Sequence, residues 1–342
     1  MAAPVQFFVL AIGIAIVGLT LRDVIDSVVI PGAAQGWLKL AERIRTLSLP
    51  VWRKTLADRR SAPRMSRTFA PFVLVATLAG WTVLLVVGFG LVLYGVRDSF
   101  DPEIRGVADA IYTSGVSLVT IGTGEPTVKG VARWAVLAAG FSGLFVITLT
   151  VSYILSIQSA LHERDTRVVS LTALPGAPRT GIAVLETYGR LDCRDDLRDL
   201  FRGWAHWSSA VAYGHSAHPA LAYFRSVSAD VDWPTAIGAI MDAAVICIAL
   251  ADAVPQSAAR FLLASGTHAV ETLARRFNLA PAAAPQLSSA DLAALAARLT
   301  VAGYAVRSDE DALQRLTAMR SQYMPYLTTL AEHLGSAPPD LL

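Results

Sequence analysis

The sequence predicts an all-α membrane protein in which three membrane-spanning helices precede an all-helical soluble domain. Three apolar stretches are long enough to cross a bilayer, whose apolar core needs about 20 helical residues. Hydrophobic residues make up 54% of the 342 residues and charged residues only 16%, against about 25% charged in an ordinary soluble domain. The net charge is +2, so no broad positive field favours nucleic acid and no nucleic-acid partner is expected.

The first apolar stretch, residues 2–21, belongs to an N-terminal transmembrane anchor over residues 1–30. A cleaved signal peptide would start with basic residues and end at a small-residue cleavage site. The stretch has neither feature before Arg22. We therefore expect the anchor to be retained, with a signal peptide as the alternative.

Basic residues collect after this anchor. From Arg22 to Arg67 there are ten basic and four acidic residues, whereas from Arg97 to Arg133 there are four basic and five acidic ones. Because basic loops stay on the cytoplasmic side of a membrane, we expect a multi-pass protein of the inner (plasma) membrane. Its N-terminus would lie outside and its C-terminal domain in the cytoplasm.

Residues 31–67 are predicted to form a basic cytoplasmic loop with an amphipathic surface helix. Apolar residues recur there at helical spacing, up to a break expected around Pro50: Trp37, Leu40, Ile44, Leu47 and Val51. Such a helix would lie on the inner surface of the bilayer. The alternative is a helix that packs on the cytoplasmic domain.

The second and third apolar stretches, residues 68–96 and 134–158, bracket a shorter apolar segment at 108–119 that is followed by TIGTG at 120–124. A short helix that ends in a Gly-x-Gly turn predicts a re-entrant loop, and non-helical backbone at membrane depth is tolerated where it lines water. Glycine adopts positive φ without steric cost. If Gly122 and Gly124 do so while Ile121 and Thr123 keep negative φ, successive carbonyls can face one side and coordinate a cation.

The sequence YTSGVSLVTIGTGE, residues 112–125, resembles the pore-helix and selectivity-filter signature of the potassium channel superfamily. Residues 68–160 resemble the pore domain of its two-span prokaryotic members, which implies a span, a pore helix, a filter and a second span. Because one chain supplies one filter strand, the resemblance implies a homotetramer. It also implies a filter whose residues bind the conducted ion: Thr120, Ile121, Gly122, Thr123 and Gly124.

The same resemblance assigns positions around the filter. Glu125 would stand at the outer mouth, and Ser117 falls where the family commonly has threonine in the pore helix. Gly143, with Gly140 as second choice, lies where the family places the gating hinge of the inner helix.

One filter residue departs from the family pattern. Thr123 replaces the tyrosine or phenylalanine whose ring braces the filter at its selective width. The expected function is therefore a tetrameric cation channel, most simply potassium-conducting, that works by passive electrodiffusion, without catalysis and without a cofactor. A weakly selective sodium and potassium channel is one alternative, and a membrane-anchored signalling or scaffold protein with a degenerate pore is another.

After a linker at residues 161–180, residues 181–342 are predicted to form an all-helical cytoplasmic domain. It lacks the GxGxxG turn of a Rossmann-like ligand sensor, so the regulatory ligand or protein partner stays unidentified. The stretch from Trp233 to Val254 contains Asp242 and Asp252, which favour a buried helix over a fourth span. Ser288 or Ser289 is expected to cap a helix, and a break is expected near Pro325 in the helix over 309–334.

Several clusters in this domain have a functional and a structural interpretation. His215 and His218, with His206, could bind a metal or a proton, but Gly214 and Pro219 predict a turn with hydrogen-bonded histidines. The aromatic residues are expected to be core rather than a cofactor site: Trp204, Trp207, Tyr213, Tyr223 and Phe224. The acidic and basic residues from Asp192 to Asp199 are expected on a solvated helix face. Cys193 and Cys247 are expected to be buried rather than a redox pair.

Overall fold

The computed structural model of the chain describes residues 3–30, 38–56, 62–122, 126–224, 226, 231–252, 256–284, 286–307, 311–337 and 340–341. The described chain is mostly helical and divides into two compact units, Met1–Ile157 (unit 1) and Gln158–Leu342 (unit 2). Among the described residues, four helices are long and apolar enough to cross a membrane: Pro4–Val28, Thr68–Gly95, Ala132–Thr172 and Trp233–Leu250.

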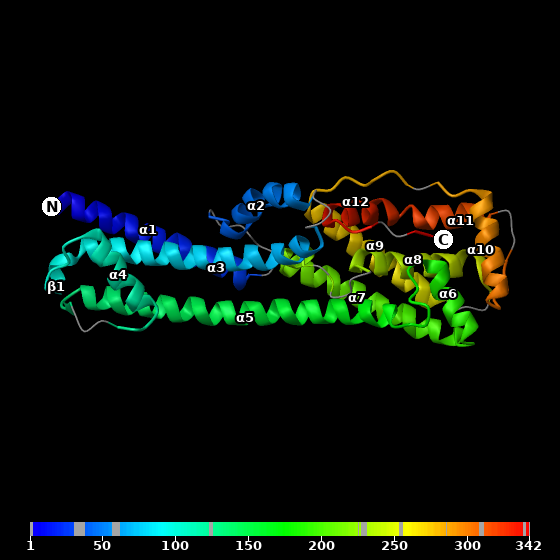
Figure 1. Cartoon of the computed structure of the whole chain (residues 1–342), viewed down its shortest axis with the longest axis horizontal. Helices are drawn as coiled ribbons and strands as arrows, with labels where there is room; N and C mark the ends of the chain where they lie inside the picture. Colours follow the sequence, from blue (N-terminus) through cyan, green and yellow to red (C-terminus); the bar gives the residue numbers. More distant parts are fainter. Residues whose placement is uncertain are drawn as a thin grey trace. The chain divides into compact units, whose positions relative to one another are not determined.

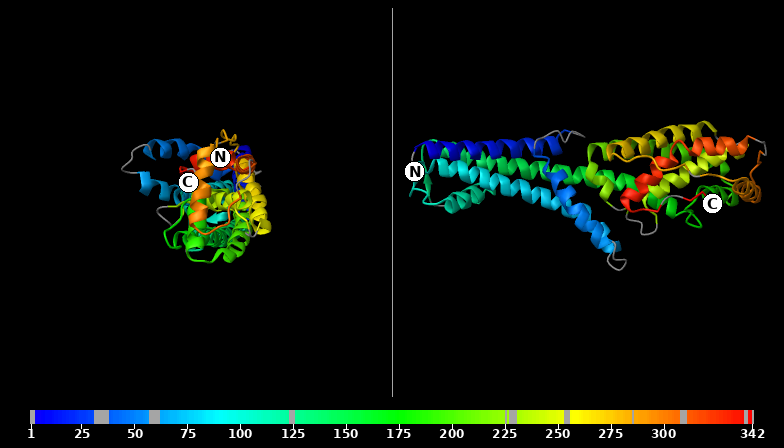
Figure 2. Two further views of the ribbon diagram at one scale, coloured as in Figure 1. Left: turned by 90° about the vertical axis from the view of Figure 1, so that its right-hand side faces the viewer. Right: turned by 90° about the horizontal axis from the view of Figure 1, so that it is seen from above.

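Unit 1 is built on α1 (Ala3–Val28), α3 (Ala62–Gly95) and the first part of α5 (Ala132–Thr172). Helices α1 and α3 lie side by side (Figures 1 and 2). A buried apolar cluster joins Trp81 and Phe89 of α3 to Val24 of α1 and Val146 of α5. Helix α5 continues without interruption across the boundary between the two units.

A shorter helix, α2 (Leu40–Leu56), follows α1 and contains Pro50 in its interior. The expected break at Pro50 was therefore wrong. Proline removes one backbone hydrogen bond and crowds the preceding turn, and the helical turns on both sides of Pro50 tolerate that loss. The start of α2 is tied to its neighbours by the buried carboxylate of Asp23, which accepts hydrogen bonds from the Trp81 indole N–H (2.8 Å) and the Leu40 backbone N–H (3.3 Å).

The segment between α3 and α5 contains η1 (Arg97–Ser99), β1 (Phe100–Asp101), α4 (Val107–Leu118) and β2 (Thr127–Val128). The two short strands pair antiparallel, with Phe100 opposite Val128 and Asp101 opposite Thr127. The Lys129 ammonium lies 2.7 Å from the Asp101 carboxylate. This small sheet, which the sequence pattern did not predict, closes the loop between the two long helices.

Unit 2 contains the end of α5 and a set of shorter helices: α6 (Gly181–Arg190), η2 (Arg194–Asp196), α7 (Leu197–Ala217), η3 (Pro219–Tyr223), α8 (Trp233–Leu250), α9 (Gln256–Arg276), α10 (Ser289–Val301), α11 (Ala312–Arg320) and α12 (Met324–Leu334). Helix α8 lies in the core, with 94% of its residues buried. The structure therefore agrees with the expectation of a buried helix in this stretch.

Asp242 is tolerated in this apolar helix because it is fully paired. The Arg320 guanidinium donates to both of its carboxylate oxygens, at 3.0 and 3.3 Å, and the Tyr323 hydroxyl donates to one of them. Buried charges are stable when they are paired and hydrogen-bonded in this way. Asp252 lies beyond the end of α8 and pairs with Arg307 at 2.8 Å.

Two local helix signals of unit 2 are confirmed. Ser288 and Asp291 form the predicted cap at the start of α10, with reciprocal hydrogen bonds to backbone N–H groups. The break near Pro325 is also confirmed, because α11 ends at Arg320 and Pro325 lies in the first turn of α12, where a missing N–H costs little.

Candidate functional site

Helix α4 is held between α3 and α5 by close backbone contacts. The Ser114 hydroxyl donates to the Val86 carbonyl of α3 at 3.0 Å. On the other side, the Leu118 carbonyl approaches Gly143 of α5 so closely that a Cβ at residue 143 would lie 1.8 Å from the carbonyl oxygen. Only glycine fits at residue 143 in this arrangement, so the carbonyl end of α4 lies directly against α5.

The backbone reverses direction directly after α4. The Thr120 N–H bonds to the Ser117 carbonyl and the Ile121 N–H to the Val116 carbonyl, both at 3.0 Å. This pair of bonds defines a Schellman motif, whose first residue after the helix cap is usually glycine. Here that residue is Thr120, with φ 59°. A β-branched residue is strained in this left-handed conformation, and such strain clusters at functional sites.

The predicted filter is described only over its first three residues. Gly122 has the expected positive φ, 73°, and Ile121 is not in the left-handed region. Thr120 also has a positive φ, which was not expected. The sign of φ therefore alternates over residues 120, 121 and 122. Thr123, Gly124 and Glu125 lie outside the described residues.

A groove of about 450 Å³ runs beside this segment between α4 and α5. Thr113, Ser117 and Thr120 lie on one side of it, and Leu137, Phe141 and Leu144 of α5 line the apolar side. The Thr113 and Ser117 hydroxyls donate to carbonyls of their own helix, at 2.8 and 2.7 Å. Their oxygen atoms keep acceptor capacity, because a hydroxyl that donates one hydrogen bond can still accept others.

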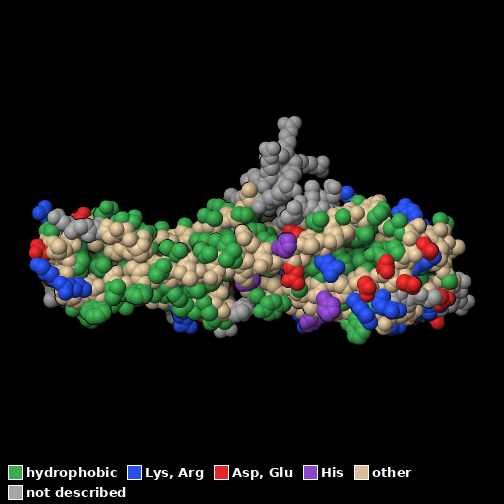
Figure 3. Space-filling view, turned by 90° about the horizontal axis from the view of Figure 1, so that it is seen from below, with side chains coloured by type: hydrophobic (Ala, Val, Ile, Leu, Met, Phe, Trp, Pro, Cys, Tyr) green, Lys and Arg blue, Asp and Glu red, His purple; other side chains and the backbone are tan. Residues whose placement is uncertain are grey.

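Large apolar side chains on this side of unit 1 are exposed. Ile121 is 75% exposed and Tyr112 of α4 is 67% exposed. Along α5 six exposed apolar residues lie three, four or seven positions apart and so share one face: Trp134, Leu137, Phe141, Leu144, Val151 and Leu155. On the face of unit 1 seen in Figure 3, charged side chains gather mainly at the end that carries β1. An apolar face of this extent requires lipid or protein to cover it.

The two candidate hinge residues lie in an unbroken part of α5. A Cβ at residue 140 would lie 3.4 Å from the Ser117 carbonyl oxygen, which is tight but tolerable. A Cβ at residue 143 would overlap the Leu118 carbonyl oxygen, so no residue except glycine fits there. Close packing against α4 is thus a sufficient reason for glycine at residue 143. The hinge role of either residue stays a prediction.

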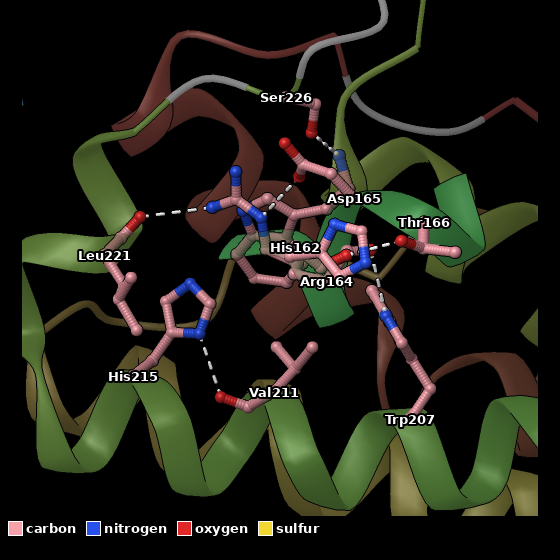
Figure 4. Close-up of polar contacts among 10 residues, drawn as sticks. His162, Arg164, Asp165, Thr166, Trp207, Val211, His215, Leu221 and Ser226 are labelled. Carbon is pink, nitrogen blue, oxygen red and sulfur yellow. Dashed lines mark hydrogen bonds and ion pairs between the residues drawn. The ribbon is translucent and has the colours of Figure 1, made fainter. Parts of the chain in front are cut away.

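A second polar cluster lies in unit 2, where the end of α5 meets α7 and η3 (Figure 4). Arg164 is only 2% exposed. Its Nε donates to Asp165 at 2.9 Å and its Nη1 to the Leu221 carbonyl at 3.1 Å, while the Trp207 indole N–H donates to the Arg164 carbonyl at 3.0 Å. These bonds join the end of α5 to both α7 and η3.

His215 of α7 lies beside this cluster, and its Nδ1 donates to the Val211 carbonyl at 2.8 Å. Complete burial, followed by the nearby charge of Arg164, lowers the pKa of His215 to about 3. The ring is therefore neutral at physiological pH. Two buried nitrogens of the cluster, Nη2 of Arg164 and Nε2 of His215, have no hydrogen-bond partner among the described residues.

Sequence reasoning missed Arg164 and misjudged the helix around the histidines. Helix α7 continues past Gly214 to Ala217, because Pro219 rather than Gly214 ends the helix. His215 therefore lies in the last turn of α7, and His218 is its C-cap residue. The hydrogen-bonded role of His215 is confirmed. No group of three metal-ligating side chains occurs in the part of the chain that the structure describes. The signal for Arg164 was its place next to Asp165, a few residues after the apolar stretch 134–158 of the same helix.

The other predicted clusters of unit 2 separate into core and surface. Trp204 and Trp207 are buried in the core, as expected, but Tyr213 is 71% exposed because it lies on the outer face of α7. Residues 192–196 form a turn and η2 instead of a helix face, since Asp192 adopts a φ of 54°. Both cysteines are free, and Cys247 is buried while Cys193 is half-buried.

Comparisons of this chain with protein-family models, with curated proteins and with solved structures found no match.

Proposed function

We propose that this protein is a tetrameric cation channel that conducts potassium by passive electrodiffusion. Each chain contributes residues 120–124 to a shared filter and residues 107–118, helix α4, as the pore helix. Helices α1, α3 and the first part of α5 span the inner membrane. The N-terminus and β1 lie outside and unit 2 lies in the cytoplasm, as the distribution of basic residues favours.

The observation that carries this proposal is the backbone after α4. A short helix between two membrane-length helices ends against Gly143, and φ alternates in sign from Thr120 to Gly122. Alternation of this kind lets successive carbonyls face the same side, where they can replace the hydration shell of a cation. The carbonyl end of α4 adds the negative end of its helix dipole, which favours a cation nearby.

The tetramer follows from the need for four filter strands around one axis. Each chain has a single TIGTG sequence, so three further copies must supply the others. The exposed face of α5 with Trp134, Phe141 and Leu144, together with Ile121, offers apolar surface for neighbouring copies. Gating would involve α5, because this helix continues from the filter region into unit 2.

A flux measurement on the purified protein in liposomes tests the proposal. Gly122→Ala forces a Cβ into a left-handed conformation, which costs about 1–2 kcal/mol, and distorts the carbonyl array. We expect it to abolish potassium flux. The matched control is Gly115→Ala within α4, where the nearest atom to a new Cβ is Val86 Cγ1 at 3.8 Å; it should conduct like the wild type. Equal flux from both variants, or no flux from the wild type, would favour a signalling or scaffold protein instead.

A further inference from the structure

A groove in unit 2 combines opposite charges with an apolar floor. It measures about 330 Å³ and lies between the end of α5 and the helices α6 and α7. Ligand sites for small molecules begin at about 300 Å³ and are mostly apolar with a few convergent polar groups. The groove therefore has room for a small ligand only.

The floor of the groove is part of the rigid core of the unit. Leu171 of α5 and Trp204 of α7 are each only 2% exposed, and Leu200 packs against the same core from the side. Tyr188 of α6 also lines the groove, and burial, then the neighbouring Cys193 and Asp196, raises the pKa of its phenol. The phenol therefore stays protonated and can donate a hydrogen bond.

The rim carries Arg167 from α5 and, from η2 and α7, Asp196 and Asp199. Across the described part of the chain, none of these three side chains forms an ion pair, although other charges of the unit do, such as Glu186 with Arg298 at 2.7 Å. All three side chains are exposed, so their charges are open to a molecule that carries both signs.

The guanidinium of Arg167 has a close neighbour in Gly203 of α7. A Cβ at residue 203 would be only 3.0 Å from Nη1 and 3.1 Å from Nη2. A larger residue at 203 would displace the guanidinium. The planar guanidinium can hold a carboxylate through two parallel hydrogen bonds.

We propose that this groove binds a basic amino acid of the lysine, ornithine or arginine class. Arg167 would hold the carboxylate of the ligand, and Asp196 and Asp199 its two cationic groups. The aliphatic stem would lie on Leu171, Leu200 and Trp204. Two carboxylates and one guanidinium match a molecule with two positive charges and one negative charge, which excludes neutral amino acids and simple diamines as the best ligands. This proposal goes beyond ion conduction and does not depend on it.

Calorimetric titration of the purified full chain in detergent with L-lysine tests the site without any measurement of flux. We expect saturable binding of L-lysine and at least tenfold weaker binding of L-leucine, which lacks the second cation, and of cadaverine, which lacks the carboxylate. A charge-assisted hydrogen bond corresponds to about a tenfold change in affinity or more.

Single substitutions test which side chain of the groove binds which charged group of the ligand. Arg167→Gln should weaken L-lysine binding at least tenfold and leave cadaverine unaffected, whereas Asp196→Asn and Asp199→Asn should each weaken both. The controls are Asp195→Asn and Arg198→Gln, exposed neighbours outside the groove, which should bind like the wild type. No binding of L-lysine or L-arginine, cadaverine binding as tight as that of L-lysine, or unchanged binding by Arg167→Gln would overturn the proposal.

Discussion

The carbonyl oxygen of Leu118 occupies the space that any side chain at Gly143 would need, with only 1.8 Å between the oxygen and a hypothetical Cβ. Through this contact the end of α4, and with it the strained turn at Thr120, is positioned directly by α5. Under the proposed function, a change in α5 would reach the filter through the same contact.

Gly143→Ala should therefore displace the end of α4. Overpacking of a tight contact costs about 1–3 kcal/mol, so we expect a lower thermal unfolding temperature in detergent and loss of potassium flux. Gly140→Ala is the control, since its Cβ would be 3.4 Å from the nearest atom, and it should lose much less stability. If Gly143→Ala keeps its stability and only its gating changes, residue 143 acts as a hinge and the packing account is wrong.

Trp81→Phe should weaken the junction of α1, α2 and α3. The change removes the indole N–H that donates to Asp23 at 2.8 Å and leaves this buried carboxylate with one hydrogen bond fewer. Loss of a buried partner costs about 1–3 kcal/mol, which chemical denaturation of the full chain would detect. Val83→Ala, at a 59% exposed position of the same helix, should be close to neutral. Equal effects of the two variants would contradict the account.

Arg320→Met should destabilise unit 2 strongly, because it leaves the fully buried Asp242 carboxylate without its counter-charge. Breaking one side of a buried ion pair costs about 3–5 kcal/mol. The double variant Asp242→Asn with Arg320→Met removes both charges and should recover part of the loss. Denaturant unfolding of the three proteins measures both effects, and a double variant no more stable than the single one would argue against a charge effect.

The buried His215 predicts a loss of stability in mild acid. Its pKa is about 3 in the folded chain and about 6.5 when unfolded. Between these values the unfolded chain binds a proton that the folded chain does not, so the free energy of unfolding falls as the pH falls below about 6.5. We expect a loss of about 2 kcal/mol between pH 6.5 and 5.

His215→Gln should remove this part of the pH dependence, whereas His206→Gln, at an exposed position of the same helix, should leave it intact. Thermal unfolding from pH 7 to 5 compares the three proteins. An unchanged pH dependence in His215→Gln would assign the effect to another group.

Hydropathy and charge were sufficient to predict the long helices, because an apolar run of more than 20 residues has few alternatives. The same reasoning separated α8 from a membrane span through Asp242, and the cap at Ser288 followed from local chemistry alone. Pro50 and Gly214 misled the prediction, since one helix-breaking residue does not end a helix that its neighbours support.

The sequence predicted the position of the candidate site, but not its backbone conformation at Thr120 or its contacts with α5. Positive φ at Gly122 follows from the chemistry of glycine, but the same conformation at Thr120 runs against the preference of a β-branched residue. Gly143 and Arg164 owe their roles to residues distant in the sequence, Leu118 in one case and Trp207 and Leu221 in the other. Such tertiary contacts leave no periodic signal in the chain.

The reversal potential of the purified protein in a planar bilayer, with potassium on one side and sodium on the other, shows whether this protein is a potassium channel. We expect a current that reverses close to the potassium equilibrium potential, because carbonyl oxygens at Thr120, Ile121 and Gly122 would select that ion. A reversal at zero would indicate a pore without selectivity, as the missing aromatic residue at Thr123 allows. The absence of current at every pH, voltage and calcium concentration would contradict the channel itself.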